Sequence, residues 1–272
     1  MLDLLHQTQP NTSEMDPIYN AVADAMDNQR PTDPVKIIAI DAMGGSGKTT
    51  FAKKIFYRAH SKNKIVLGSA ATGLAAQVYE DLEFETVHTT YGVPVIEDED
   101  EYDNINNIEC IYNAQRVDLI NAADVLIFDE VFSNHKYCLT AIMKSYNQLK
   151  GKVVLFLMDR GQTCPVVRNG SRRDTVNATI MRLPLWNTIE RYTLNTNLRL
   201  LAMQHADPND PHFLRQQTYA RALTEIRTNG PFSGQGPLYE MNSNDIIGEK
   251  ILRFEGSIFI LSTIYLTKPR LF

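Results

Sequence analysis

The sequence predicts an α/β protein in which a parallel β-sheet is covered by helices on both faces. Three observations support this prediction. Short apolar runs, typical of buried strands, alternate with segments of helical periodicity. A glycine-rich loop joins the first of these strands to the helix that follows it. Acidic residues come directly after later strands, at the carboxyl ends where parallel sheets gather their ligands.

The composition excludes several classes of protein. The chain has 272 residues, 43% of them hydrophobic, which is enough for one large domain or two smaller ones. No apolar run reaches the roughly 18–20 residues that cross a bilayer, and the N-terminus lacks the features of a signal peptide, so we expect no membrane partner. The cysteines Cys110, Cys138 and Cys164 are scattered, which favours a reducing, intracellular compartment over a disulfide framework.

The expected elements can be placed in chain order from these patterns. An amphipathic helix around Ile18, Val22 and Met26 predicts a helical lead-in over residues 1–34. Strands are expected at residues 35–40, 64–68, 125–128 and 153–157. Helices are expected at residues 49–59, 73–82, 112–122, 137–149 and 213–228. Residues 229–236 resemble a linker, and residues 258–266 resemble a strand.

The glycine-rich loop matches the phosphate-binding pattern G-x-x-x-x-G-K-[ST]. Its candidate nucleotide-binding residues are Gly44, Gly45, Ser46, Gly47, Lys48 and Thr49. Backbone N–H groups of the loop would surround phosphate oxygens, Lys48 would reach the β- and γ-phosphates, and Thr49 would bind Mg²⁺. Ala42 stands where the pattern has its first glycine, and a positive φ there would cost about 1 kcal/mol. The loop predicts a P-loop NTPase that binds ATP.

An acidic pair, Asp129 and Glu130, ends the apolar strand expected at residues 125–128. In such a pair Asp129 would hold Mg²⁺ through water, and Glu130 would orient or deprotonate the attacking water. The alternative is a carboxylate that caps the N-terminus of the next helix. Together with the phosphate loop, the pair predicts a site that hydrolyses its nucleotide.

Charge is distributed unevenly along the chain. Residues 1–159 hold 13 Lys or Arg and 23 Asp or Glu, whereas residues 160–230 hold ten Arg and five Asp or Glu. Arginine pairs bidentately with phosphate oxygens, so the second segment could contact a nucleic-acid backbone. A solvated basic surface is the alternative.

Seven short blocks follow one another in a fixed order. They are GGSGKT at residues 44–49, SAATGLAA at 69–76, TVH at 86–88, DE at 129–130, QTCPVV at 162–167, GSR at 170–172 with VNA at 176–178, and LNTNLRL at 194–200. This series resembles the Pif-type (petite integration frequency) DNA helicase family, which includes the helicase domains of Helitron transposons. The resemblance covers roughly residues 35–200 and implies a superfamily-1 motor that moves 5′ to 3′ on single-stranded DNA.

The resemblance also implies roles for individual residues. Gln162 would sense the γ-phosphate, and Arg199 would bring positive charge to it; both are counted as catalytic with Asp129 and Glu130. Three further residues would touch the DNA strand: Thr72, Gly73 and His88. Their structural alternatives are a helix N-cap, a turn glycine and a surface histidine.

The sequence also departs from the family pattern. Met15 stands where the family has a glutamine that reads adenine, which puts adenine selectivity in question. The acidic pair continues with Val131 and Phe132 instead of a small pair, and residues 158–162 lack the usual glycine and carry the arginine one position earlier. Motifs of a second motor domain are not found. We therefore expect residues 35–200 to form a RecA-like domain 1A, and residues 201–272 to form a helical segment and the truncated start of the second domain.

Three hypotheses follow. The chain is a Pif-type ATP-dependent DNA helicase, or a remnant of a mobile element that binds nucleotide without unwinding, or a P-loop small-molecule kinase; the blocks around Gln162 and Arg199 argue against the kinase. For the isolated chain we expect weak ATPase activity, no strand separation and a monomeric state. The family is compatible with DNA repair, recombination, telomere maintenance and transposition, and in a eukaryotic cell with the nucleus or the mitochondrion.

Overall fold

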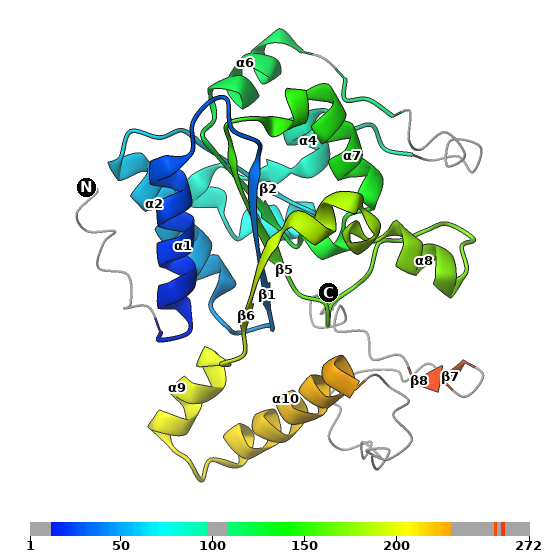
Figure 1. Ribbon diagram of the computed structural model, residues 1–272. Helices are drawn as coiled ribbons and strands as arrows, with labels where there is room; N and C mark the ends of the chain where they lie inside the picture. Colours follow the sequence, from blue (N-terminus) through cyan, green and yellow to red (C-terminus); the bar gives the residue numbers. More distant parts are fainter. Residues whose placement is uncertain (1–11, 97–107, 112, 230–252, 255–256, 259–272) are drawn as a thin grey trace, which may run out of the picture.

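The computed structural model describes residues 12–96, 108–111, 113–229, 253–254 and 257–258. Its centre is a six-stranded parallel sheet in the order β3-β2-β4-β5-β1-β6 (Figure 1). The strands are β1 (Lys36–Ala42), β2 (Val66–Ala70), β3 (Glu85–Thr86), β4 (Val125–Asp129), β5 (Val153–Met158) and β6 (Glu190–Leu194). The parallel sheet expected from the sequence is confirmed.

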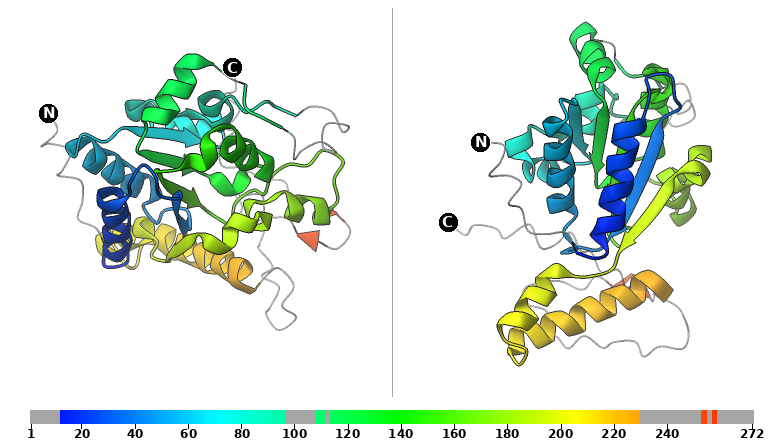
Figure 2. Two further views of the ribbon diagram at one scale, coloured as in Figure 1. Left: turned by 45° about the horizontal axis from the view of Figure 1, so that its top comes forward. Right: turned by 60° about the vertical axis from the view of Figure 1, so that its left-hand side comes forward.

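The central strands are buried on both faces because helices cover each side. Side chains alternate along a strand, so Ile38 and Ile40 of β1 belong to one hydrophobic core and Ile37 and Ala39 to the other. The first core packs under α1 (Met15–Asn28), α2 (Lys48–Ser61) and α3 (Gly73–Gln77). The second packs under α4 (Val87–Tyr91), α6 (Ala114–Ala122) and α7 (Lys136–Ser145). Figure 2 shows the two helical layers on opposite sides of the sheet.

Several elements differ from the sequence-based expectation. The helix expected at residues 73–82 is two pieces, α3 and the 3₁₀ turn η2 (Glu80–Leu82). The helix expected at residues 137–149 ends at Ser145, because Gln148 in the following turn η5 (Asn147–Leu149) has a left-handed φ of 54°. The remaining 3₁₀ turns are η4 (Val131–Ser133), η6 (Ile180–Arg182) and η7 (Pro184–Thr188).

Elements at both ends of the chain meet the carboxyl edge of the sheet. Helix α1 packs on the sheet through Ile18, Val22 and Met26, so the lead-in contributes to the core. Helix α8 (Arg172–Ala178) lies between β5 and β6 in the chain, and α9 (Leu198–Ala206) and α10 (Pro211–Asn229) follow β6. Figure 1 places α9 and α10 beyond the ends of β1 and β6.

The structure describes little of the C-terminal segment. Two short strands, β7 (Arg253–Phe254) and β8 (Ser257–Ile258), pair antiparallel. Almost all of the linker and strand expected at residues 229–236 and 258–266 lies outside the described residues. Among those that are described, no helix has the length and hydropathy of a membrane span.

A close approach at Gly68 of β2 gives a stability prediction. A Cβ atom there would lie 1.9 Å from the ring of Phe84, which stacks on Tyr79 with ring centroids 4.3 Å apart. We expect Gly68→Ala to lower the free energy of unfolding by about 1–3 kcal/mol, measured in urea, because buried rings must shift. Gly73→Ala is the control, since a Cβ there meets nothing within 4 Å. Equal stability of the two variants would contradict the packing described.

Candidate nucleotide-hydrolysis site

The glycine-rich loop forms a tight turn between β1 and α2. Gly45 and Gly47 have φ of 83° and 88°, a left-handed conformation that glycine adopts without steric cost. The Ser46 hydroxyl donates to the Met43 carbonyl at 2.7 Å and closes the turn. Gly47 directly precedes α2, so the free N–H groups at the start of that helix face the loop. This arrangement forms a cradle for phosphate oxygens.

The expected penalty at Ala42 is wrong. Ala42 is the last residue of β1, is fully buried and pairs with Leu194 of β6. It is not among the residues with positive φ, because the left-handed positions of the loop fall on Gly45 and Gly47 instead. Alanine at the first position of the pattern therefore costs the loop no backbone strain.

Lys48 and Thr49 begin α2. The Lys48 ammonium donates to the Ala42 carbonyl at 2.8 Å and lies 3.6 Å from the Asp159 carboxylate, with the side chain 12% exposed. Burial raises the pKa of the Asp129 and Glu130 carboxyls, and the charge of Lys48 partly opposes that rise. The Lys48 ammonium therefore lies among acidic groups beside the phosphate cradle, as a phosphate-binding lysine would.

Three aspartates end three neighbouring strands at the same edge of the sheet. Asp41, Asp129 and Asp159 follow the hydrophobic stretches of β1, β4 and β5, and all three are buried. Of these three aspartates, only Asp129 belongs to a motif that the sequence reveals. Asp41 accepts a hydrogen bond from the Arg160 guanidinium. The arginine that stands one position earlier than in the family pattern therefore pairs with Asp41.

Asp129 and Glu130 have different surroundings. The Asp129 Oδ1 atom accepts the N–H of Glu130 at 2.8 Å. Glu130 has a left-handed φ of 51°, and its side chain makes no capping hydrogen bond, so the helix-cap alternative is not observed for Glu130. Burial raises the pKa of both carboxyls, and the charge of Asp129 raises that of Glu130 further. A carboxyl with a raised pKa is suited to proton transfer.

The donor set fits a magnesium ion. The Thr49 hydroxyl and the Asp129 carboxylate supply hard oxygen ligands beside the phosphate cradle. The described residues contain no group of three or more His, Cys, Asp or Glu side chains that could hold a metal alone. Mg²⁺ takes one or two protein ligands and completes its shell with water and substrate phosphates, and Thr49 and Asp129 would be two such ligands.

The start of α9 docks on the phosphate loop. Leu198 N–H donates to the Gly45 carbonyl at 2.9 Å, and the Asn197 amide donates to the Gly44 carbonyl at 3.4 Å. The Cδ atom of Arg199 lies 3.3 Å from the position that a Cβ atom on Gly45 would take, so the stem of this exposed arginine contacts the loop.

Four further candidate residues lie outside the phosphate loop and the acidic pair. Gln162 is in the turn after β5, where its N–H donates to the Asp159 carbonyl at 3.1 Å. Thr72 and Gly73 are exposed at the carboxyl end of β2; the Thr72 hydroxyl caps α3, as its structural alternative predicted. His88 is half-buried, with Nδ1 2.9 Å from the Val93 carbonyl oxygen and Nε2 4.0 Å from Cys138 Sγ. His88 is therefore held within the fold rather than free on the surface.

Met15 lies under the phosphate loop. It is 3% exposed, and its methyl carbon is 2.7 Å from the Cβ position of Gly47. Its neighbour Glu14 accepts the N–H groups of Asn195 and Thr196, which fixes the start of α1 to the segment before α9. Met15 offers packing at this place and no amide that could read a base.

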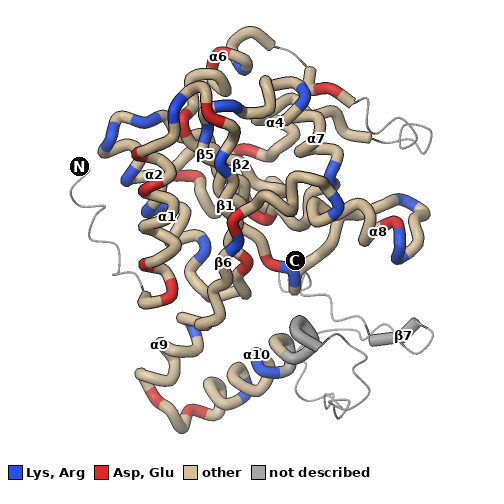
Figure 3. Tube along the Cα trace, in the orientation of Figure 1, with Lys and Arg blue, Asp and Glu red and all other residues tan. Residues whose placement is uncertain are grey.

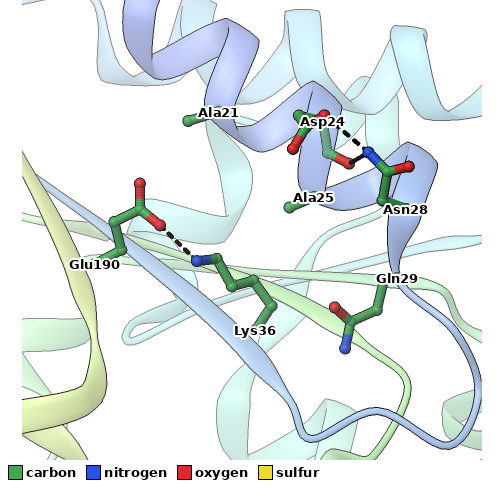
Figure 4. Close-up of a pocket in the computed structure, with 7 residues that line it drawn as sticks. All are labelled: Ala21, Asp24, Ala25, Asn28, Gln29, Lys36 and Glu190. Atoms are coloured by element: carbon green, nitrogen blue, oxygen red, sulfur yellow. Dashed lines mark hydrogen bonds and ion pairs between the residues drawn. The ribbon is translucent and has the colours of Figure 1, made fainter.

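One pocket lies away from this centre (Figure 4). It measures about 260 Å³ and is lined by Ala21, Asp24, Ala25, Asn28, Gln29, Lys36 and Glu190. Lys36 begins β1, so the pocket is at the end of the strand opposite the phosphate loop, and the Lys36–Glu190 ion pair at 2.5 Å spans it. Ligands of parallel sheets bind at the carboxyl ends, so we assign no catalytic role to this pocket.

The fold and the loop geometry together define a P-loop NTPase with a RecA-like sheet. A family model for PIF1-like helicases matches residues 11–232, which is more than half of the chain. The chain belongs to the PIF1-like helicase family. A comparison with curated proteins found no match.

Solved Pif1 helicases share the fold. A structure of two coordinating Pif1 helicases at forked double-stranded DNA is 21% identical, with a TM-score of 0.58 over 83% of this chain and 50% of that chain. Bacteroides Pif1 with ADP-AlF3 and single-stranded DNA is 21% identical, with a TM-score of 0.57 over 83% and 48%. Candida albicans Pif1 is 18% identical, with a TM-score of 0.52 over 77% and 47%. The chain spans about half the length of these relatives.

Proposed function

We propose that this chain hydrolyses ATP with Mg²⁺ and uses the energy to move 5′ to 3′ along single-stranded DNA, as the nucleotide-hydrolysing part of a helicase. One observation carries the proposal: Lys48, the Asp129–Glu130 pair and Arg199 converge on a phosphate loop in a chain of the PIF1-like helicase family. Family membership argues against the small-molecule kinase.

The residues of the site would divide the work in the following way. Lys48 would exchange its contacts with the Ala42 carbonyl and Asp159 for phosphate oxygens, and Thr49 and Asp129 would hold the metal. Bound magnesium supplies positive charge against the β- and γ-phosphates. Glu130 orients and deprotonates the attacking water. Arg199 and Gln162 contact the γ-phosphate, so α9 and the turn after β5 sense whether it is present.

Single-stranded DNA is the proposed partner. The structure of Bacteroides Pif1 contains this ligand together with ADP-AlF3. In this chain Thr72 and Gly73 are exposed at the edge of the sheet that carries the nucleotide site. Arg172 and Arg173 at the start of α8 are also exposed, in the segment that follows β5. Figure 3 shows Lys or Arg residues on α8. Hydroxyl, backbone N–H and guanidinium groups are the usual contacts to phosphate.

The basic segment yields a testable binding prediction. We expect single-stranded DNA affinity to fall steeply with salt, and the double variant Arg172→Ala/Arg173→Ala to reduce the slope of log affinity against log salt by about 1–2. Fluorescence anisotropy of a labelled oligonucleotide measures both. Arg30→Ala is the control, because Arg30 is exposed on the loop before β1, at the opposite edge of the sheet. Equal slopes for the unmodified chain and for both variants would show that the α8 arginines are only a solvated surface.

A mobile-element remnant that binds nucleotide without unwinding is the second candidate. Single-turnover unwinding of 5′-tailed and 3′-tailed duplexes separates the two. Unwinding of the 5′-tailed duplex by the 272-residue chain would overturn the remnant hypothesis, and unwinding of only the 3′-tailed duplex would overturn the proposed direction.

A further inference from the structure

A buried tyrosine hydroxyl lies beside the proposed magnesium ligands and has no role in the function described above. Tyr79 follows α3 and is completely buried. Its hydroxyl oxygen makes no hydrogen bond of acceptable geometry in the described structure. The polar side chains that it faces are Asp129 and Thr49, which come from β4 and α2. A buried hydroxyl without a hydrogen-bond partner at such a place indicates that its hydrogen bonds form only in another state of the site.

The packing around Tyr79 fixes the direction of its hydroxyl. The ring stacks on Phe84 with centroids 4.3 Å apart and an interplanar angle of 16°. Gly68 of β2 leaves the space that Phe84 occupies. The same core contains Phe51, one turn after the start of α2. The ring of Tyr79 is therefore fixed by an aromatic stack in a core shared with α2, and its hydroxyl is buried away from solvent.

The hydroxyls of Thr49 and Tyr79 and the carboxylate of Asp129 can form one chain of hydrogen bonds. One oxygen of Asp129 accepts the Glu130 N–H, which leaves the other free to accept. A threonine hydroxyl has one proton and two lone pairs, and a tyrosine hydroxyl can donate and accept at the same time. If Thr49 donates to Tyr79 and Tyr79 donates to Asp129, the lone pairs of Thr49 are left to face a metal ion.

We propose that Tyr79 is a positioning residue of the magnesium site: its hydroxyl links Thr49 to Asp129 and orients both toward the metal. This inference rests on the proposed nucleotide site and deepens it. The tyrosine does not bind the metal. It acts as the outer hydrogen-bond partner of two metal ligands, a type of residue whose loss weakens metal affinity by about 10- to 100-fold in other proteins.

Tyr79→Phe tests the inference, because it removes the hydroxyl and keeps the stacked ring. Binding of a fluorescent ADP analogue is measured in EDTA and then over a range of Mg²⁺ concentrations. We expect unchanged affinity in EDTA and a Mg²⁺ requirement about tenfold higher than in the unmodified chain. Tyr91→Phe is a matched control: Tyr91 is also fully buried, also has an unpartnered hydroxyl, and stacks on Phe128 in the opposite core.

The outcomes separate the inference from the proposed function. An unchanged Mg²⁺ requirement in Tyr79→Phe, with normal binding by the unmodified chain, would overturn the positioning role alone. The same result with a higher melting temperature would identify the hydroxyl as an unsatisfied core group. Failure of the unmodified chain to bind the analogue with Mg²⁺ would overturn the nucleotide site and this inference together.

Discussion

Replacement of Lys48 by alanine is expected to weaken Mg·ATP binding by about 10- to 100-fold and to slow hydrolysis by roughly 100- to 1000-fold. The Lys48 ammonium lies beside the phosphate cradle, 2.8 Å from the Ala42 carbonyl and 3.6 Å from Asp159. Alanine leaves the phosphates without that charge and leaves Asp159 without its ion pair. Titration with a fluorescent ATP analogue and a phosphate-release assay measure the two effects.

The control for this variant lies on the same helix. Lys53 lies further along α2 and makes a more exposed ion pair with Asp81 at 2.7 Å. We expect Lys53→Ala to bind and hydrolyse ATP as the unmodified chain does, because exposed pairs contribute little. If Lys48→Ala retained full affinity, the assignment of the phosphate loop would be wrong.

The second large effect is expected for Glu130→Gln: loss of hydrolysis by roughly 100- to 10,000-fold with ATP binding retained. The amide keeps the shape of the side chain and removes the group that would take a proton from water. Burial and the neighbouring Asp129 raise the pKa of the Glu130 carboxyl in the folded chain. The ionised form therefore destabilises the fold at neutral pH, and the glutamine variant should melt at an equal or higher temperature.

The sign of the pH effect follows from that raised pKa. Glu130 favours the folded state below its unfolded pKa, and this contribution is lost as pH rises through the higher folded value. Thermal melting of the unmodified chain and of Glu130→Gln, over the pH range between the unfolded and folded pKa values, measures this loss of stability. We expect a smaller loss for Glu130→Gln. Glu83→Gln is the control, since Glu83 has a similar left-handed φ of 55° but is exposed. Full ATPase activity in Glu130→Gln would show that another group activates the water.

Local patterns in the sequence were sufficient to predict the centre of the fold. The strands β1, β4 and β5 are buried on both faces, so each is a continuous apolar run that alternation with helices makes recognisable. The phosphate loop is also local, because its glycines, lysine and threonine are consecutive. Asp129 could be predicted from its place at the end of an apolar run.

Features that depend on distant contacts could not be predicted in the same way. Strand β6 is an edge strand with alternating exposure, and its sequence ERYTL carries no apolar run. The strain expected at Ala42 was wrong because the pattern does not reveal which loop residue takes positive φ. The Lys48–Asp159 and Arg160–Asp41 pairs join different strand ends and follow only from the strand order. Tyr79 carried no signal at all, since its role depends on where α3 places the ring.

The rate of ATP hydrolysis by the 272-residue chain, measured against single-stranded DNA concentration with and without Mg²⁺, tests the central claim most directly. The proposed function predicts Mg²⁺-dependent hydrolysis that rises with added DNA and disappears in Lys48→Ala. Hydrolysis that ignores DNA, that survives in Lys48→Ala, or that is absent under all these conditions would contradict it.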